Sequence, residues 1–254
     1  MTAEAVIRRG GGVPVVVLDP YSLVENGVLS LDVKSAAGMT GKEILKDLAS
    51  NLNVICKKYP DDTGRPATAM VCFALEFNTH NEVNPSGNDA IDSPQKQAFR
   101  RVFREAYTIL HQYGGDNVQV IWAGNEAGTK ADREHYWPGN DDHMNPLGQD
   151  SVDWVGMTAY AGPYGINTLD QMQGGFYDYY ARDRDHPFIF VETSADTYAV
   201  NPADQDATKA AHVTYLYNTS TLSPYPNIKG IIWFNVAKGE GGFTKNFLLP
   251  TAVD

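Results

Sequence analysis

Short apolar stretches alternate with amphipathic stretches along most of the chain. The segment 13–18, Val-Pro-Val-Val-Val-Leu, is an almost continuous apolar run, typical of a strand buried on both faces of a parallel sheet. Further short apolar stretches follow it at intervals. The pattern predicts six strands, at residues 13–18, 68–77, 118–123, 151–160, 187–193 and 228–236.

Helices are predicted between these strands. Thr40 can cap the first helix, in which Ile44, Leu48 and Leu52 recur at helical spacing. A second helix is expected to stop at Gly114, because glycine commonly ends helices. The helices after the first are predicted at residues 94–113, 168–181 and 204–220.

Strand-helix alternation with apolar strands predicts an α/β fold in which helices cover a parallel sheet. We expect a (β/α)8 TIM-barrel type, and the alternative is an open doubly wound sheet. The doubly wound fold usually carries a glycine-rich phosphate-binding turn after its first strand. Asp19, Pro20 and Tyr21 stand at that place here, so the barrel is favoured. Function is then expected at the carboxyl ends of the strands.

The chain has 254 residues and a formal net charge of −11. This acidic balance argues against binding to nucleic acid or to an anionic membrane surface, because both need a basic face. Neither a repeat nor a linker is evident, so we expect one domain over residues 1–254. The first twelve residues lack the apolar core of a signal peptide. Two cysteines, Cys56 and Cys72, make no disulfide framework.

Two of the predicted strands end in a glutamate. Glu76 follows the apolar run 70–75 and, by the two-residue period of a strand, is expected to share a face with Cys72 and Ala74. Glu192 follows another apolar strand. Two carboxyl groups over one barrel mouth suit glycoside hydrolysis, in which one protonates the leaving oxygen and the other attacks the sugar. The alternative is that each glutamate pairs with a lysine or arginine at the rim.

Aromatic and amide side chains accompany these glutamates at the predicted strand ends and in one loop. Aromatic rings offer flat faces on which sugar rings can lie, and amides can bind hydroxyl groups. Together they favour a polar, ring-shaped ligand. The candidate substrate-binding residues are Asn78, Trp122, Asn125, Trp137, Tyr160, Trp233 and Asn235.

Several motifs, taken together and in order, resemble one enzyme family. They are Glu-Phe-Asn at 76–78, Tyr-Trp-Pro-Gly at 136–139, the segment 152–160, Phe-Val-Glu-Thr at 190–193 and the segment 229–235. The chain thereby resembles glycoside hydrolase family 26, whose best-known members are endo-β-1,4-mannanases. The resemblance covers most of the chain from residue 13 to about residue 240.

The resemblance implies a single catalytic barrel domain and a retaining mechanism. It makes Glu76, on the fourth barrel strand, the acid/base and Glu192, on the seventh, the nucleophile. Tyr160 would hydrogen-bond the nucleophile, and Trp233 would form the floor of the cleaved-sugar subsite. The implied partner is a β-linked oligo- or polysaccharide, no metal or other cofactor is implied, and a secreted protein is expected.

The chain departs from the family pattern around Glu76. Leu75 stands where the family usually has histidine, Cys72 where it usually has arginine, and the segment 79–85 replaces a tryptophan-rich stretch. These changes remove polar groups that position the sugar and the acid. Alternatives to a mannanase are therefore a β-glucanase or β-xylanase of the same mechanism, or a catalytically impaired carbohydrate-binding protein.

The family's strand numbering leaves two strand-helix units without a counterpart, because only about twelve residues precede the strand at 13–18. We therefore expect six recognisable strands, an open sheet edge and exposed apolar surface. The chain would then be a fragment, or another chain or the stretch 5–9 would cover the gap. Self-association is one expected consequence.

Overall fold

The computed structural model forms two compact units, Met1–Trp154 and Val155–Asp254, which are called here the first and the second unit. Each is described by itself. The described residues are 2–8, 12–60, 63–80, 93–125, 134–139, 150–161, 176–195, 204–240 and 243–249.

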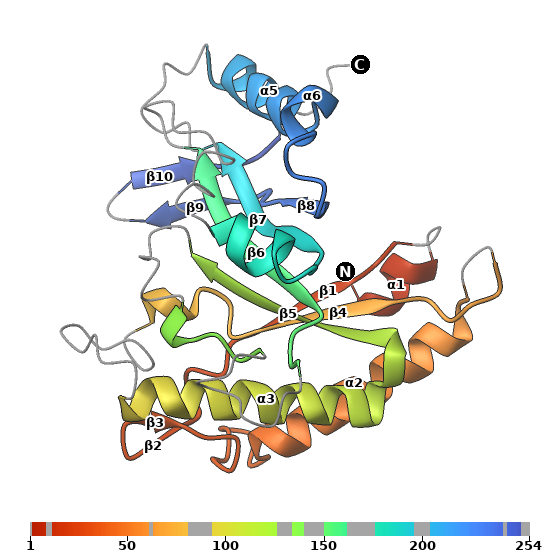
Figure 1. Cartoon of the computed structure of the whole chain (residues 1–254), viewed down its shortest axis with the longest axis vertical. Helices are drawn as coiled ribbons and strands as arrows, with labels where there is room; N and C mark the ends of the chain where they lie inside the picture. Colours follow the sequence, from red (N-terminus) through yellow and green to blue (C-terminus); the bar gives the residue numbers. More distant parts are fainter. Residues whose placement is uncertain are drawn as a thin grey trace. The chain divides into compact units, whose positions relative to one another are not determined.

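The first unit is built on three parallel strands in the order β1-β4-β5 (Figure 1). They are β1 (Val15–Leu18), β4 (Ala69–Phe73) and β5 (Val118–Asn125). All five residues of β4 are buried, as expected for the middle strand. The prediction that the segment 13–18 is buried on both faces is wrong, because Val17 on β1 and Val13 before it are each 45% exposed. Within the described part of the first unit, β1 pairs only with β4 and is therefore an edge strand.

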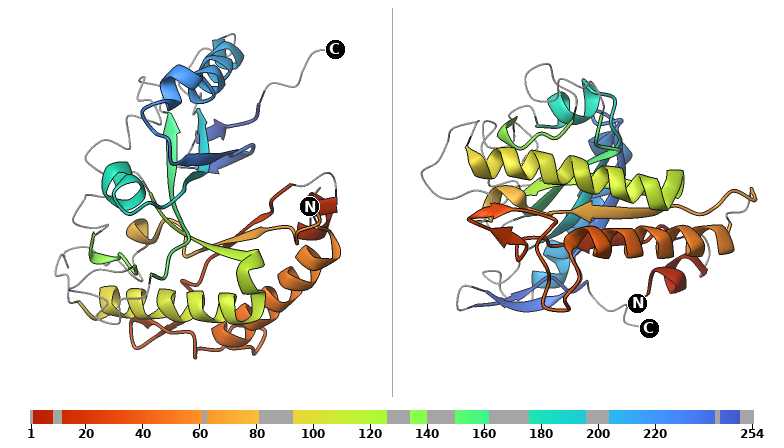
Figure 2. Two further views of the ribbon diagram at one scale, coloured as in Figure 1. Left: turned by 45° about the vertical axis from the view of Figure 1, so that its right-hand side comes forward. Right: turned by 90° about the horizontal axis from the view of Figure 1, so that it is seen from below.

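Two long helices, α2 (Gly41–Lys58) and α3 (Pro94–Gly114), lie side by side in both views (Figures 1 and 2). The predicted cap is confirmed: Thr40 Oγ1 accepts from the backbone N–H of Glu43, whose carboxylate accepts from the N–H of Thr40. The predicted stop of α3 is also confirmed, because Gly115 follows it with φ 62°, a conformation that suits glycine.

Smaller elements complete the first unit. The antiparallel pair β2 (Val24–Glu25) and β3 (Val28–Leu29) turns at Asn26 and Gly27, which both have positive φ, as a two-residue hairpin turn requires. Helix α1 (Ala3–Arg8) contacts α2. Glu4 of α1 accepts from Lys58 Nζ at 3.0 Å and from Tyr59 Oη at 2.6 Å. Two 3-10 turns are η1 (Phe77–Thr79) and η2 (Gly115–Asn117).

The second unit is built on three further parallel strands, in the order β6-β7-β8. They are β6 (Trp154–Ala161), β7 (Phe188–Ala195) and β8 (Ile228–Trp233). A π-helix, η4 (Tyr177–Arg182), precedes β7, and an antiparallel hairpin of β9 (Ala237–Glu240) and β10 (Phe243–Asn246) follows β8. The six predicted strands are thus all present.

Two helix predictions in the second unit need correction. Of the helix predicted at 168–181, residues 168–175 lie outside the described residues, and residues 177–181 belong to the π-helix η4, which Phe176 precedes. The helix predicted at 204–220 is divided into α5 (Gln205–Leu216) and α6 (Thr219–Leu222). The division falls at Asn218, whose side chain caps α6 by accepting from the N–H of Ser220 and so favours a new helix start.

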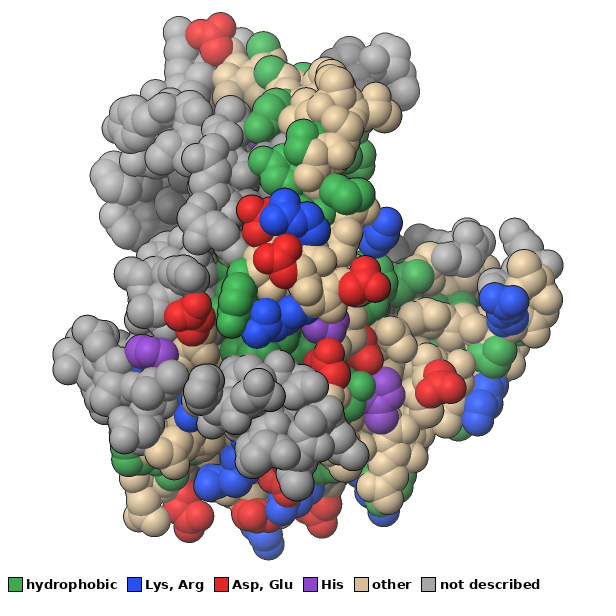
Figure 3. Space-filling view, in the orientation of Figure 1, with side chains coloured by type: hydrophobic (Ala, Val, Ile, Leu, Met, Phe, Trp, Pro, Cys, Tyr) green, Lys and Arg blue, Asp and Glu red, His purple; other side chains and the backbone are tan. Residues whose placement is uncertain are grey.

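Charged side chains of both signs are interspersed on the face that Figure 3 shows, notably over α2 and α3. Ion pairs of the first unit include Lys42 Nζ with Glu105 and with Asp32, each at 2.7 Å. Among the described residues, no helix has the length and apolar character needed to cross a membrane.

Candidate functional site

Glu76 lies on a left-handed turn rather than on a strand. Strand β4 ends at Phe73, and both Ala74 and Glu76 have positive φ, 59° and 55°. The prediction of a strand reaching residue 77 is therefore wrong, and so is the prediction that Glu76 shares a strand face with Cys72. Non-glycine residues adopt this conformation only when their surroundings impose it, and such residues often cluster at functional sites.

The backbone around Glu76 is held by the neighbouring strand and by the loop after β1. The N–H of Glu76 donates to the carbonyl of Ala123 on β5 at 3.2 Å. Tyr21 Oη donates to the carbonyl of Leu75 at 2.6 Å. These contacts fix the turn from both sides, which offsets its conformational cost.

Two asparagines fix the Glu76 side chain. Asn125 Nδ2 donates to Glu76 Oε1 at 2.7 Å. Asn78 binds the backbone of Asn125 twice: its Oδ1 accepts from the N–H at 2.7 Å and its Nδ2 donates to the carbonyl at 3.0 Å. The structure thus brings Glu76, Asn78 and Asn125 together, with the 6% exposed Asn78 holding Asn125 in place.

A stacked pair next to this turn was missed from the sequence. The rings of Tyr21 and His80 are nearly parallel, 16° apart, with their centroids separated by 3.6 Å. Tyr21 is buried and His80 half-buried. Tyr21 follows β1 directly after Asp19-Pro20, the position where a barrel carries functional residues, and that position was the signal available in the sequence.

Trp122 and Trp137 are brought together in the core of the first unit. They are 0% and 1% exposed, and their rings meet edge to face at 4.9 Å. Trp122 also stacks on Phe77, the residue after Glu76, at 4.9 Å. Trp122 thus packs against the residue that follows Glu76, and direct contact of either indole with a sugar stays a prediction.

In the second unit, a β-bulge sets the direction of Glu192. Opposite β7, Met157 pairs with Phe190 but Thr158 pairs with Glu192, so Val191 is an extra residue. Paired residues of neighbouring strands share a face, and residues two apart on one strand share a face. Glu192 therefore lies on the face of Thr158 and Tyr160. A regular register would pair Glu192 with Ala159, on the opposite face.

Tyr160 Oη donates to Glu192 Oε2 at 2.5 Å, a length expected when a hydroxyl donates to a carboxylate. This is the hydrogen bond that the family resemblance implies. Tyr160 and Glu192 are both half-buried, at the carboxyl ends of β6 and β7. The structure thus brings these two candidate residues into direct contact.

Trp233 and Asn235 hold a later segment of the chain, residues 247–249. Trp233 Nε1 donates to the carbonyl of Phe247 at 2.9 Å, and Ser194 Oγ donates to the same carbonyl at 3.4 Å. Asn235 Oδ1 accepts from the N–H of Leu249 at 2.7 Å. In this structure these polar groups form hydrogen bonds to the backbone of residues 247 and 249. Their contact with a sugar stays a prediction.

Two ionisable side chains of α5 are buried behind Trp233. The rings of His212 and Trp233 have centroids 5.9 Å apart, and burial lowers the pKa of His212 to about 4. Burial also lowers the pKa of Lys209, which is 1% exposed and donates to the carbonyl of Leu248 at 2.7 Å. Neither residue was singled out from the sequence.

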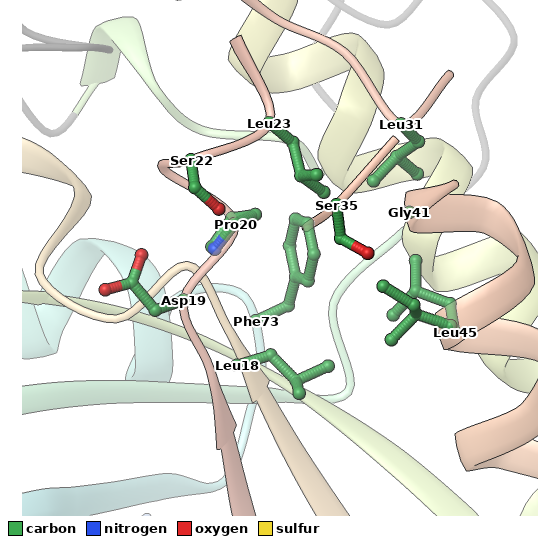
Figure 4. A pocket seen from close by; sticks show the side chains of 11 residues that line it. Leu18, Asp19, Pro20, Ser22, Leu23, Leu31, Ser35, Gly41, Leu45 and Phe73 are labelled. Atoms are coloured by element: carbon green, nitrogen blue, oxygen red, sulfur yellow. The ribbon is translucent and has the colours of Figure 1, made fainter. Parts of the chain in front are cut away.

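A pocket in the first unit is a poor match for a sugar (Figure 4). It lies between the ends of β1 and β4, the β2–β3 hairpin and the start of α2. Its lining is mainly aliphatic and aromatic, whereas sugar hydroxyl groups need hydrogen-bonding partners when they are buried. The lining residues are Leu18, Asp19, Pro20, Ser22, Leu23, Leu31, Ser35, Gly41, Ile44, Leu45 and Phe73.

Cys56 and Cys72 are both buried and form no disulfide bond with each other. Within the described ranges, no group of three or more histidine, cysteine, aspartate or glutamate side chains could hold a metal ion.

Solved structures similar to this one include mannanases. A Bacillus subtilis mannanase matches with a TM-score of 0.57 at 15% identity, over 92% of this chain and 62% of that protein. An endo-β-1,4-mannanase of Cellulomonas fimi matches with a TM-score of 0.56 at 16% identity, over 99% of this chain and 52% of that protein. A family 26 β-mannanase from Bacteroides ovatus has a TM-score of 0.51 at 12% identity.

The chain has the fold of the family 26 glycoside hydrolases. The expected α/β fold of (β/α)8 type with six recognisable strands is thereby confirmed. The chain spans less than two thirds of the length of these mannanases. Protein-family models and curated protein sequences give no match to the chain. At this level of identity the likeness concerns the fold, so function has to be argued from the site.

Proposed function

We propose that the chain is a retaining glycoside hydrolase that cleaves a β-linked polysaccharide, with a β-1,4-mannan as the first candidate. The observation that carries this proposal is the bond from Tyr160 to Glu192, on a strand whose bulge turns Glu192 onto the face of Tyr160. A carboxylate held by a fixed donor at the end of a parallel strand suits a nucleophile, because its attacking oxygen is oriented before the substrate arrives.

In the proposed reaction, Glu76 protonates the oxygen of the leaving sugar while Glu192 attacks the anomeric carbon. The glycosidic bond breaks as an ester bond to Glu192 forms. Glu76 then takes a proton from water, which attacks the same carbon and releases Glu192. Retaining enzymes of this type place their two carboxyl groups roughly 5–5.5 Å apart. A crystal structure with a separation beyond about 10 Å in an intact site would overturn the assignment.

The fold of the mannanase neighbours supports mannan as the substrate class, whereas the residues around Glu76 keep the choice of polysaccharide open. The test is incubation with mannan, xylan and mixed-linkage β-glucan, followed by product sizing. Release of oligosaccharides from one of the three identifies the substrate. Nuclear magnetic resonance of the first product gives the stereochemistry, and inversion would refute the retaining mechanism.

Three variants test the roles of the glutamates. Glu192→Gln should abolish the release of reducing ends, and Glu76→Gln should slow it roughly 10²–10⁴-fold, while the fold persists in both. Glu105→Gln is the matched control, because it makes the same chemical change on α3, where Glu105 pairs with Lys42 at 2.7 Å. It should keep wild-type activity. Wild-type activity in either of the other two variants would remove that residue from the mechanism.

A second candidate is a carbohydrate-binding protein without hydrolysis. It is favoured by Cys72, which is 0% exposed where the family usually has arginine, and by the burial of Trp122 and Trp137. Calorimetry with β-1,4-linked oligosaccharides separates the two candidates. Binding without any product after long incubation supports the second, and product formation refutes it.

Location and assembly are also part of this proposal. A polysaccharide of this class lies outside the cell, so we infer that the chain acts as a secreted, single catalytic domain. The exposed Val17 on the edge strand β1 and the exposed Val13 just before it favour self-association, since unpaired strand edges and apolar surface tend to be covered. Sedimentation over a range of concentrations tests the assembly, and a monomer at all of them would refute it.

A further inference from the structure

A buried ammonium group lies at the start of a chain of contacts that ends at Glu192. Lys209 is on α5 and is 1% exposed. Burying a charge is costly unless the charge is paired or hydrogen-bonded. Lys209 forms no ion pair within the described residues. Its Nζ instead donates to the backbone carbonyl of Leu248 at 2.7 Å. An uncommon and costly arrangement of this kind suggests a specific role.

The carbonyl that Lys209 holds belongs to the 247–249 segment. The N–H of Phe247 donates to the carbonyl of Val236 at 3.0 Å, which attaches the segment to the chain just after β8. The carbonyl of Phe247 accepts from Trp233 Nε1, and the N–H of Leu249 donates to Asn235 Oδ1. Lys209 therefore binds Leu248, the middle residue of this segment. The residues on either side of Leu248 are bound by Trp233 on β8 and by Asn235 just after β8.

The ring of Phe247 packs against the ring of Tyr160 and thereby limits its movement. Phe247 is 3% exposed, and its ring centroid lies 5.3 Å from that of Tyr160 and 5.6 Å from that of Phe234. Tyr160 and Phe234 also meet edge to face at 6.0 Å. Three mutually packed rings leave the Tyr160 ring little freedom to turn. The hydroxyl of that ring is the group that donates to Glu192 at 2.5 Å.

We propose that Lys209 is a positioning residue for the nucleophile. Through Leu248 and Phe247 it keeps Tyr160 oriented, and Tyr160 orients Glu192. The inference rests on the proposed function for its catalytic consequence. A merely structural role would alter stability but leave the turnover of folded protein unchanged, because substrate contacts neither Lys209 nor Leu248 in this scheme.

The test uses the full chain with β-1,4-linked mannohexaose and four variants. Lys209→Met keeps the aliphatic stem but removes the donor, and Lys209→Arg restores a donor. Lys229→Met is the matched control, because Lys229 also donates to a backbone carbonyl, that of Pro226 at 2.8 Å, but is exposed on β8. Phe247→Ala breaks the same chain of contacts while leaving Lys209 in place.

Lys209→Met should lower kcat about tenfold or more, with KM changed less than about threefold, because a misoriented nucleophile slows the chemical step more than it weakens binding. Phe247→Ala should act in the same direction. Lys209→Arg should recover part of kcat, and Lys229→Met should match the wild type. Unchanged kcat in folded Lys209→Met, or equal losses in Lys229→Met, would overturn the inference.

A second readout does not depend on catalysis. The indole N–H of Trp233, identified by the spectrum of Trp233→Phe, should exchange with solvent faster in Lys209→Met than in the wild type, because its acceptor is released. If the wild type cleaves no glycan, the proposed function fails, and this signal alone decides whether Lys209 holds the segment. If Lys209→Met does not fold, Phe247→Ala decides the kinetic question.

Discussion

The two candidate carboxylates reach their positions by different structural means. Glu76 lies beyond the end of β4, on a turn with left-handed residues that contacts from β5 and from Tyr21 hold in place. Glu192 lies within β7, where regular strand pairing continues on both sides of a one-residue bulge. The first position depends on side chains that are distant in sequence, and the second depends on strand register.

This difference bears on how each residue tolerates change. A turn held by a few hydrogen bonds can be altered locally, and the surroundings of Glu76 do depart from the family pattern at Leu75 and Cys72. A strand inside a sheet cannot be altered without affecting its neighbours, and the motif around Glu192 matches the family closely. The comparison predicts that Glu192 and Tyr160 tolerate substitution less well than Glu76 and Asn125.

The largest expected effect separates the roles of the two glutamates. Glu76→Gln should slow cleavage of the natural polysaccharide roughly 10²–10⁴-fold, because an unprotonated leaving oxygen departs slowly. An aryl glycoside whose leaving group departs without protonation should restore the first step. Glu192→Gln should stay inactive on both substrates, because the attacking oxygen is missing. Recovery of Glu192→Gln on the aryl glycoside would reverse the assignment.

The next effect compares the two hydrogen-bond donors. Tyr160→Phe removes the donor to Glu192 and should lower kcat about 10- to 100-fold on both kinds of substrate, as expected for loss of a hydrogen bond to a charged group. Asn125→Ala removes the donor to Glu76 and should slow only the natural substrate. Initial rates on the polysaccharide and the aryl glycoside measure this. Equal losses in both variants on both substrates would contradict the division of roles.

Acid should destabilise the second unit through His212. Its pKa is about 4 in the folded chain against an ordinary value of 6.5, so the unfolded chain binds the proton first as the pH falls. The stabilisation is therefore complete above pH 6.5 and is lost between about pH 6.5 and pH 4, by up to about 3 kcal/mol.

Hydrogen exchange followed by mass spectrometry measures this prediction for both units in one sample. Peptides of the second unit should lose protection over this pH range in the wild type. His212→Gln should remove that loss, with peptides of the first unit as the internal control. The same loss in His212→Gln would show that another group is responsible.

The smallest effect concerns the first unit alone. Thr40→Ala removes the cap of α2, whose Oγ1 accepts from the N–H of Glu43, and should cost about 1 kcal/mol. Exchange protection of peptides from α2 should fall, while peptides of the second unit should keep theirs. Thr40→Ser, which keeps the hydroxyl group, is the matched control. An equal loss in both variants would mean that the cap contributes nothing.

Local signals in the sequence predicted much of the fold. The cap at Thr40, the stop at Gly114 and the apolar strands are short-range features that depend on neighbouring residues, and each is present. The contact between Tyr160 and Glu192 followed from a family motif at either end. The break at Asn218 was missed, although asparagine is a common helix cap.

Long-range features could not be predicted in this way. The positive φ of Glu76 depends on Tyr21 and β5, which no local pattern around residue 76 reveals. The bulge at Val191 depends on how β7 pairs with β6. The apolar pattern of a strand does not reveal whether such a bulge is present. Lys209 was not singled out from the sequence, because the carbonyl that it holds lies 39 residues further along the chain.

The extra residue in β7 also has a consequence at the level of the gene. Deleting the single codon of Val191 would remove the bulge and leave β7 in a regular register with β6. Phe190 would still pair with Met157 and Glu192 with Thr158, so Glu192 would stay on the face of Tyr160. The direction of Glu192 is therefore expected to survive the loss of this one codon.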